Sequence, residues 1–177
     1  FLRDPAERVI SYYNAKMEEV DKKIAFDEWY AKQMKNDMVH FLDLKYKGHA
    51  SSRTPVLSVF MPIIRRLNYK TFFFLQTLAL KFMKKGKNAE LKKLENAKKL
   101  LDLCWFVGIV ENSKEDFDFL FKAMGLKKEK LKNVNASKKI LELDNVLRKK
   151  IYDENPLDVE LYQYALKLNR EKRPKSR

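Results

Sequence analysis

Cysteine is nearly absent from this sequence. Cys104 is the only one in 177 residues, so the chain cannot form an internal disulfide, and this favours a reducing compartment. The two histidines and one cysteine offer no zinc-like spacing, and we expect no metal. No apolar run is long enough to span a membrane, because Arg65, Arg66 and Lys70 interrupt the apolar stretch 56–80. No signal peptide is visible.

Positive charge is what the sequence has in excess. Lysine and arginine number 38 against 24 acidic residues, which gives a formal net charge of +14. Such a surplus attracts polyanions, among them nucleic acid, acidic lipid, phosphorylated cofactors and sulfated glycans, without distinguishing them. With 45% hydrophobic and 12% aromatic residues, the chain is expected to fold as a single domain over 1–177, with a basic tail at 170–177.

Helices dominate the predicted secondary structure. Asp4 is a suitable N-cap for a helix that starts at Pro5 and ends near Lys23, and the Gly and Ser residues of 46–53 predict a loop. The other helices expected from apolar periodicity are 26–35, 55–84 with a kink at Pro62, 89–103, 113–125 with Ser113 as cap and Asp116 in a capping box, 143–153, and 156–170 with Asn155 as cap. The side chains expected to face a core include Val9, Tyr12, Tyr13, Met17, Phe26, Trp29, Met34, Leu157, Leu161, Tyr164 and Leu168.

One segment is typical of a buried strand. Residues Cys104–Val110 are short, β-branched and aromatic, and apolar on both faces, as in a parallel sheet. Phe1-Leu2 has the character of the end of a second strand that leads into Arg3-Asp4-Pro5. We therefore expect an α/β domain that starts mid-domain, mostly helical in this chain, with one or two short buried strands and much of the sheet missing.

The segment with the clearest chemical meaning is FLRDPAERVISYYN, residues 1–14. Arg3 is expected at the carboxyl end of a strand, where ligands bind open α/β sheets, and Ser11 lies two turns into the following helix. A guanidinium can hold a phosphate through two parallel hydrogen bonds, and a hydroxyl can add a third donor. The same spacing also suits a structural role, in which Arg3 pairs with an acid and Ser11 faces solvent.

This stretch resembles the 3′-phosphate-binding motif of sulfotransferases. The form Arg3-Asp4-Pro5, Glu7-Arg8 and Ser11-Tyr12-Tyr13 is most similar to carbohydrate-type sulfotransferases, the heparan and chondroitin branch and its bacterial relatives. The resemblance also covers 97–126, which includes the string Val107–Glu111, the Asn-containing loop at 133–135 and the terminal helix from Asn155. It thus extends over the two ends and the latter half of the chain, about half of the residues, whereas 39–87 match poorly.

The resemblance implies a P-loop-like sulfotransferase fold and transfer of a sulfuryl group from 3′-phosphoadenosine-5′-phosphosulfate (PAPS) to a hydroxyl or amine of a carbohydrate-like acceptor. Arg3 and Ser11 would bind the donor's 3′-phosphate. The loop residues Asn135, Ser137, Lys138 and Lys139 are weaker candidates for contact with the nucleotide. The family's Gly/Lys/Thr-rich 5′-phosphosulfate loop, which precedes this motif, has no counterpart in a chain with only 4 glycines, so we expect that N-terminal part to be missing.

The catalytic base is also expected upstream, with His40 and, less favoured, His49 as alternatives within the chain. A second hypothesis is a basic helical module that binds nucleic acid or an anionic glycan without catalysis. It rests on the net charge and on Phe72–Phe74 near Arg65 and Arg66. Against it, no zinc finger or other nucleic-acid-binding signature is present, and we expect no nucleic-acid partner. The expected location is the cytoplasm of a bacterium; the alternative is the Golgi lumen behind an upstream anchor.

Overall fold

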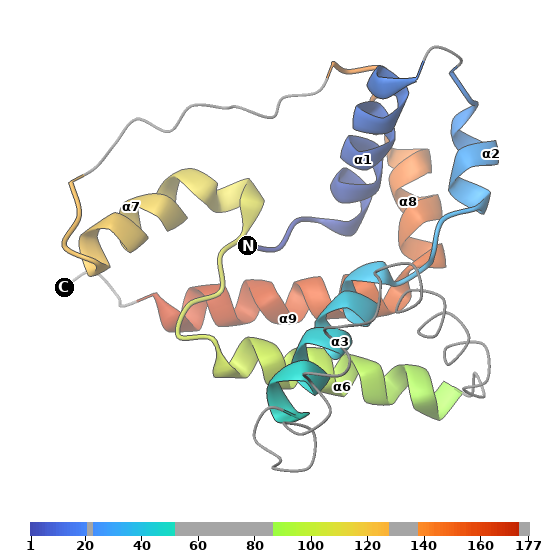
Figure 1. Ribbon diagram of the computed structural model, residues 1–177. Coiled ribbons are helices and arrows are strands. Elements are labelled where there is room, and N and C mark those ends of the chain that lie inside the picture. Colours follow the sequence, from blue (N-terminus) through green and yellow to red (C-terminus); the bar gives the residue numbers. More distant parts are fainter. Residues whose placement is uncertain (21–22, 52–86, 128–137, 174–177) are drawn as a thin grey trace, which may run out of the picture. The chain divides into compact units, whose positions relative to one another are not determined.

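The computed structural model of the chain describes residues 1–20, 23–51, 87–127 and 138–173. These residues belong to two compact units: 1–37 with 101–177, which we call the first unit, and 38–100, the second unit. The elements, labelled in Figure 1, are α1 (Pro5–Glu19), α2 (Phe26–Ala31), α3 (Asp37–Ser51), α6 (Lys87–Leu103), the 3₁₀ turn η1 (Val110–Asn112), α7 (Ser113–Ala123), α8 (Asn145–Glu154) and α9 (Pro156–Lys172). Of the described helices, none is long and apolar enough to cross a bilayer.

Helix α1 begins as the sequence predicts. Asp4 is its N-cap, and one carboxylate oxygen accepts hydrogen bonds from the backbone N–H groups of Ala6 and Glu7, at 2.9 and 3.0 Å. Pro5 occupies the first turn, where no intrahelical donor is lost. The helix ends four residues before the expected Lys23, because the backbone at Val20 is already extended.

The core of the first unit lies where α1 packs beside α2 and α8 (Figure 1). Its buried residues are Ala6, Ile10, Tyr13, Met17, Trp29, Tyr30 and Ile151. Tyr12 and Met34, both expected to face inward, are 50% and 64% exposed, so those two predictions are wrong. Tyr12 touches only the rim of the core through the ring of Trp29, at 5.6 Å between centroids.

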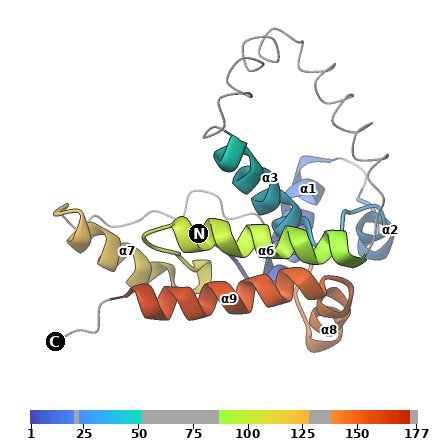
Figure 2. The ribbon, with the colours of Figure 1, turned by 90° about the horizontal axis from the view of Figure 1, so that it is seen from below.

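The corner between α8 and α9, visible in Figure 2, is held by an asparagine from elsewhere in the chain. Asn155 stands at the N-cap position, as predicted, but its side chain donates to the Tyr30 hydroxyl and the Ile151 carbonyl, each at 2.7 Å. The cap is supplied instead by Asn36, whose Oδ1 accepts from the backbone of Leu157 and of the residue after it, at 2.9 and 3.2 Å. Asn36 adopts a left-handed conformation, φ 53°.

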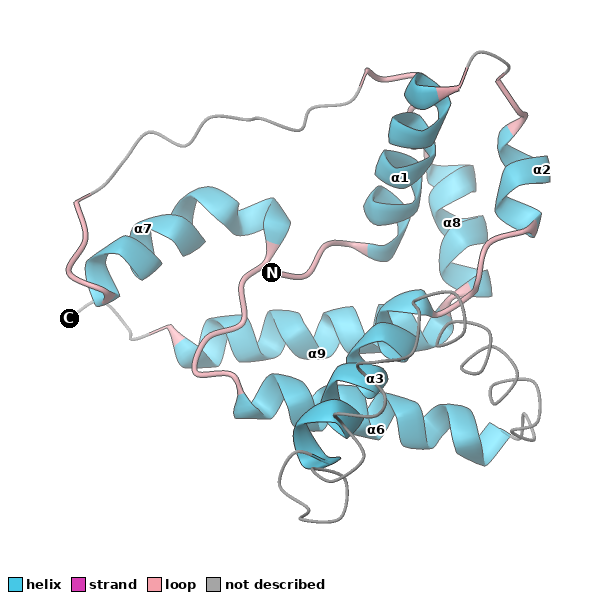
Figure 3. Ribbon diagram, in the orientation of Figure 1, coloured by secondary structure: helices cyan, strands magenta, loops and turns pink. Residues whose placement is uncertain are grey.

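Residues 104–110 do not form the expected strand. Within the described residues the pairing is one parallel bridge between Leu2 and Ile109, closed by two backbone hydrogen bonds of 2.8 Å, from Leu2 to Gly108 and from Val110 to Leu2. Figure 3 accordingly draws helices and loops, with no strand among the described residues. The bridge stays isolated because Leu2 is the one described residue that pairs with this segment, and a ladder needs a longer partner. The expected parallel sheet is thus unconfirmed.

Helix α7 begins differently from the prediction. Ser113 is its first residue rather than its cap, and Asn112 occupies the cap position without a side-chain hydrogen bond. Asp116, expected in a capping box, is instead fully buried. Its carboxylate accepts hydrogen bonds from Ile109 N–H at 2.6 Å and from the Asn169 amide at 3.0 and 3.1 Å. Asp116 therefore fixes the bridge segment to α9.

Helices α7 and α9 end close to the predicted positions. The turn after α7 contains Gly125 at φ 66°, as expected of a glycine that ends a helix. Helix α9 runs to Lys172, so residues 170–172 of the expected tail are helical, while 174–177 lie outside the described residues. In α9, Leu161 and Leu168 are buried as expected, and Leu157 and Tyr164 are half-buried.

The second unit contains α3 and most of α6. The loop expected at 46–53 is wrong up to Ser51, because α3 continues through Gly48; a single glycine costs a helix only about 1 kcal/mol. The predicted helix 89–103 is confirmed as α6. A buried hydrogen bond of 2.7 Å from the Asn96 amide to Asp43 joins the two helices. The helix expected at 55–84, with Phe72–Phe74, lies outside the described residues.

Candidate functional site

Arg3 and Ser11 belong to the segment that leads into α1 and forms its start. Arg3 follows the bridge residue Leu2 and precedes the N-cap, and Ser11 lies two turns into the helix. Glu7 and Ser11, four residues apart within α1, are neighbours on the helix surface, whereas Arg3 precedes the helix. The Arg3 guanidinium lies 3.8 Å from the Glu7 carboxylate, with both side chains 36% exposed. Ser11 is half-buried and makes no hydrogen bond within the described part of the chain.

We use the name Arg3 turn for residues Leu2–Asp4, and its backbone is held by Glu111 of η1, which is itself bound by α9. The Asp4 N–H donates to Glu111 Oε1 at 2.9 Å, and the Tyr162 hydroxyl donates to Glu111 Oε2, also at 2.9 Å. Burial, and next the hydrogen bond to Glu111, raise the pKa of Tyr162, so its phenol stays a donor. Together with the bridge at Leu2, these contacts fix the direction in which Arg3 leaves the backbone.

The side chain of Asp4 ties the same turn to α8. Beyond its two backbone donors, Asp4 accepts a hydrogen bond from the Tyr152 hydroxyl. It also forms an ion pair with Arg148, whose Nη1 lies 3.2 Å from the carboxylate. Burial is the first cause that raises the pKa of Tyr152, followed by its bond to Asp4. Arg148 Nη2 also reaches Glu7 Oε1 at 2.9 Å. Two helices remote in sequence therefore converge on the start of α1, as their proximity in Figure 1 shows.

Arg3 is the cation of this turn that is best placed for a ligand. Arg148 is committed to two carboxylates at hydrogen-bonding or ion-pair distance, whereas Arg3 has one carboxylate at 3.8 Å, beyond a normal hydrogen bond. A guanidinium in that state keeps its N–H donors for a planar or tetrahedral anion. The arrangement suits anion binding.

The other predicted site residues lie apart from the Arg3 turn or outside the description. Asn135 and Ser137 lie outside the described residues. Lys138 and Lys139 are exposed: the Lys138 N–H approaches Glu18 at 3.3 Å, and the Lys139 ammonium lies 3.9 Å from a carboxylate on its own loop. Nothing in the structure assigns them a ligand.

His40 belongs to the second unit. Its Nε2 lies 3.4 Å from Glu90, which also pairs with Lys93 at 2.7 Å. The side chain of His49 lies outside the description. Among the described residues, no group of three or more His, Cys, Asp or Glu side chains is arranged to hold a metal ion.

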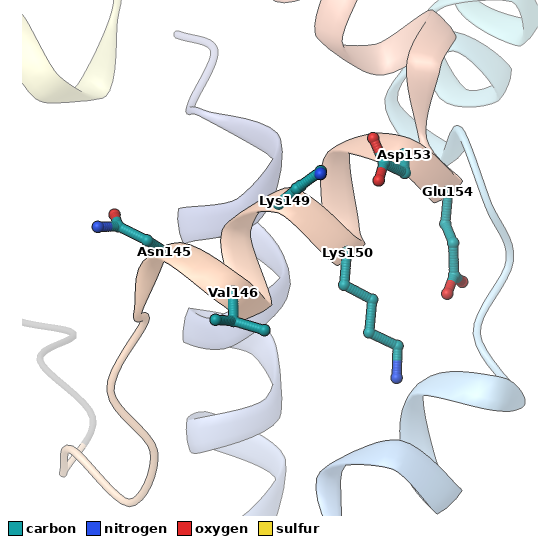
Figure 4. Close-up of a pocket in the computed structure, with 6 residues that line it drawn as sticks. All are labelled: Asn145, Val146, Lys149, Lys150, Asp153 and Glu154. Atoms are coloured by element: carbon teal, nitrogen blue, oxygen red, sulfur yellow. The ribbon is translucent and has the colours of Figure 1, made fainter.

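A shallow hollow of about 540 Å³ lies on α8, on the side turned away from α1 (Figure 4). Its lining residues are Asn145, Val146, Lys149, Lys150, Asp153 and Glu154. They alternate along the helix with Leu147 and Ile151, which pack on α1. The hollow contains none of the predicted site residues, and Lys150 pairs there with Asp27 at 2.7 Å.

Four residues that hold the Arg3 turn were given no role by the sequence analysis: Glu111, Arg148, Tyr152 and Tyr162. Glu111 stood at the end of the Val107–Glu111 string, but without a role. The contacts from Asp4 to Glu111 and from Glu7 to Arg148 span 107 and 141 residues. No spacing rule reports a pair so distant, and the sequence held no signal that identified Arg148.

Comparison with known proteins bears directly on this turn. A family model described as the sulfotransferase family matches residues 1–165 of the chain. The match includes Arg3, Ser11 and all four residues that hold the turn. No curated protein and no solved structure matches the chain significantly.

Proposed function

The chain belongs to the sulfotransferase family, and on that premise we propose that it transfers a sulfuryl group from PAPS to a hydroxyl or amine of a carbohydrate-like acceptor. In this proposal, Arg3 and Ser11 bind the 3′-phosphate of the donor. Residues 1–177 thus supply the 3′-phosphate-binding part of the donor site. A cytoplasmic location is proposed with it, supported by the single cysteine.

The observation that carries the proposal is the state of Arg3. Its side chain is partly exposed and holds no close ion pair, while the backbone on both sides of it is fixed by the bridge at Leu2 and by Glu111. Because this backbone is already ordered, only the Arg3 side chain has to be ordered when an anion binds. The hydroxyl of Ser11, two turns into α1, has no hydrogen-bond partner among the described residues and is a further donor for such an anion.

Arg3 and Ser11 act by binding and orientation. PAPS supplies the sulfuryl group, and the 3′-phosphate is remote from the sulfur, so its binding energy serves to position the donor rather than to stabilise the charge that develops on transfer. The base that deprotonates the acceptor is a separate group. Within this chain His40, whose Nε2 lies 3.4 Å from Glu90, is a weaker candidate for that role.

The test of the proposal is a transfer assay with the full-length protein and radiolabelled PAPS. Heparan-type and chondroitin-type polysaccharides are offered as acceptors, alongside small hydroxylated molecules. We expect label in a saccharide product with the wild type and with the control Lys150→Gln, and strongly reduced label with Arg3→Ala. Label in none of the acceptors, or equal transfer by Arg3→Ala, would falsify the proposal.

A further inference from the structure

Glu7 poses a difficulty for an anion at the Arg3 turn. Its Oε2 lies 3.8 Å from the Arg3 guanidinium, and Ser11 is its neighbour one turn further along α1. A carboxylate in that position competes with a phosphate for Arg3 and also repels it. The turn can therefore bind a phosphate well only if the charge of Glu7 is engaged elsewhere.

Arg148 provides that engagement. Its Nη2 lies 2.9 Å from Glu7 Oε1, the length of a charge-assisted hydrogen bond, whereas Arg3 lies 3.8 Å from the other oxygen. The Arg148 side chain is itself fixed, because Nη1 contacts Asp4 at 3.2 Å and the Tyr152 hydroxyl at 3.4 Å. Glu7 is thus bound to α8 and only adjacent to Arg3.

We propose that Arg148 is a positioning residue for the sulfuryl donor: it retains Glu7 and so leaves the Arg3 guanidinium to the donor's 3′-phosphate. This inference rests on the proposed function. It concerns Glu7 more than Asp4, because Asp4 has other donors in the backbone N–H groups of Ala6 and Glu7 and in Tyr152. In the described part of the chain, the carboxylate of Glu7 pairs with Arg148 and Arg3 alone.

Removal of Arg148 has a definite consequence. Glu7 is left with Arg3 as its one cationic neighbour and pairs with it, so a phosphate must displace a carboxylate before it binds. The repulsion between Glu7 and the phosphate is no longer compensated. One unpaired carboxylate close to a dianion, in a mostly aqueous setting, weakens binding about tenfold.

The experiment is calorimetric titration of the full-length protein with adenosine 3′,5′-bisphosphate and with adenosine 5′-monophosphate. The ratio of the two Kd values isolates the contribution of the 3′-phosphate. Arg148→Gln is expected to reduce this preference about tenfold, and the double variant Glu7→Gln with Arg148→Gln to restore it to within about threefold of the wild type. Lys150→Gln is the matched control, because it removes the same charge from the other side of α8, and the preference is expected to be unchanged.

The outcomes separate the two proposals. If the wild type prefers the bisphosphate but Arg148→Gln keeps that preference, or the double variant fails to restore it, the positioning role is overturned while the proposed function stands. A wild type without any preference overturns both. If Arg148→Gln does not fold, Glu7→Gln alone decides: because Arg148 already engages Glu7, the preference is expected to stay within about threefold of the wild type, and a gain of about tenfold would show that Glu7 opposes the phosphate despite Arg148 and overturns the inference. If the Arg148–Glu7 ion pair only stabilises the fold, replacing Glu7 in addition to Arg148 is not expected to restore the preference for the bisphosphate.

Discussion

Replacement of Asp116 by Asn is expected to destabilise the protein by about 3 kcal/mol. The carboxylate is fully buried and accepts from the Ile109 N–H and the Asn169 amide, and it pairs with Arg173. An amide at this position must turn its NH₂ group toward one of these donors, whichever way it is flipped. One buried donor is then left unsatisfied, at a cost of about 2 kcal/mol.

The lost ion pair adds less. The Arg173 side chain is 30% exposed, so water takes over part of the pairing, and we assign about 1 kcal/mol to it. For a protein of this size, a loss of about 3 kcal/mol lowers Tm by about 10 °C. The measurement is thermal unfolding followed by circular dichroism, with Glu115→Gln as control, since it removes the same charge from an exposed neighbouring position. A Tm for Asp116→Asn within about 2 °C of the control would refute the role given to the buried carboxylate.

Two further predictions concern the corner between α8 and α9. Asn36→Ala is expected to lower the free energy of unfolding by about 2 kcal/mol, because it removes the cap at Leu157 and leaves alanine in a left-handed backbone conformation. Asn36→Gly removes only the cap and is expected to cost about 1 kcal/mol. Equal urea midpoints for the two variants would contradict the backbone contribution. Burial raises the pKa of Tyr30 to about 12, although its hydrogen bond from Asn155 acts to lower it. The folded protein therefore keeps this proton between pH 10 and 12, where the unfolded chain loses it. Wild-type stability relative to Tyr30→Phe should fall by up to ~2 kcal/mol over that range, and a constant difference in urea denaturation would oppose this.

Predictions from local signals were the most accurate. The cap at Asp4 involves donors two and three residues away, and it is confirmed. The spans of α6, α8 and α9 differ from those expected by two residues or fewer at each end, since apolar periodicity reports them directly. Asp116 shows the limit of such signals. The Ser-x-x-Asp spacing predicts a capping box, but the carboxylate instead accepts hydrogen bonds from Asn169 and Arg173, which are distant in sequence.

In the candidate site, too, the residues with a local sequence signal were predicted and those brought in by distant segments were not. Arg3 and Ser11 were found because both belong to one short segment that resembles a known motif. Their surroundings depend on Glu111 and Arg148, which approach from segments over a hundred residues away and carry no local pattern. The opposite error occurred at Gly48, where a local loop signal was outweighed by the helix formers on both sides. Contacts set by the tertiary fold are therefore the part that the sequence did not reveal.

The most direct measurement of the central claim is the bisphosphate-to-monophosphate preference of Arg3→Ala and Ser11→Ala, titrated calorimetrically in the full-length protein. Hydrogen bonds to a charged group contribute about 1.5–3 kcal/mol each. We therefore expect the preference to fall about a hundredfold for Arg3→Ala and about tenfold for Ser11→Ala, with Tm unchanged to within about 3 °C. A preference equal to that of the wild type in both variants would show that the 3′-phosphate binds elsewhere.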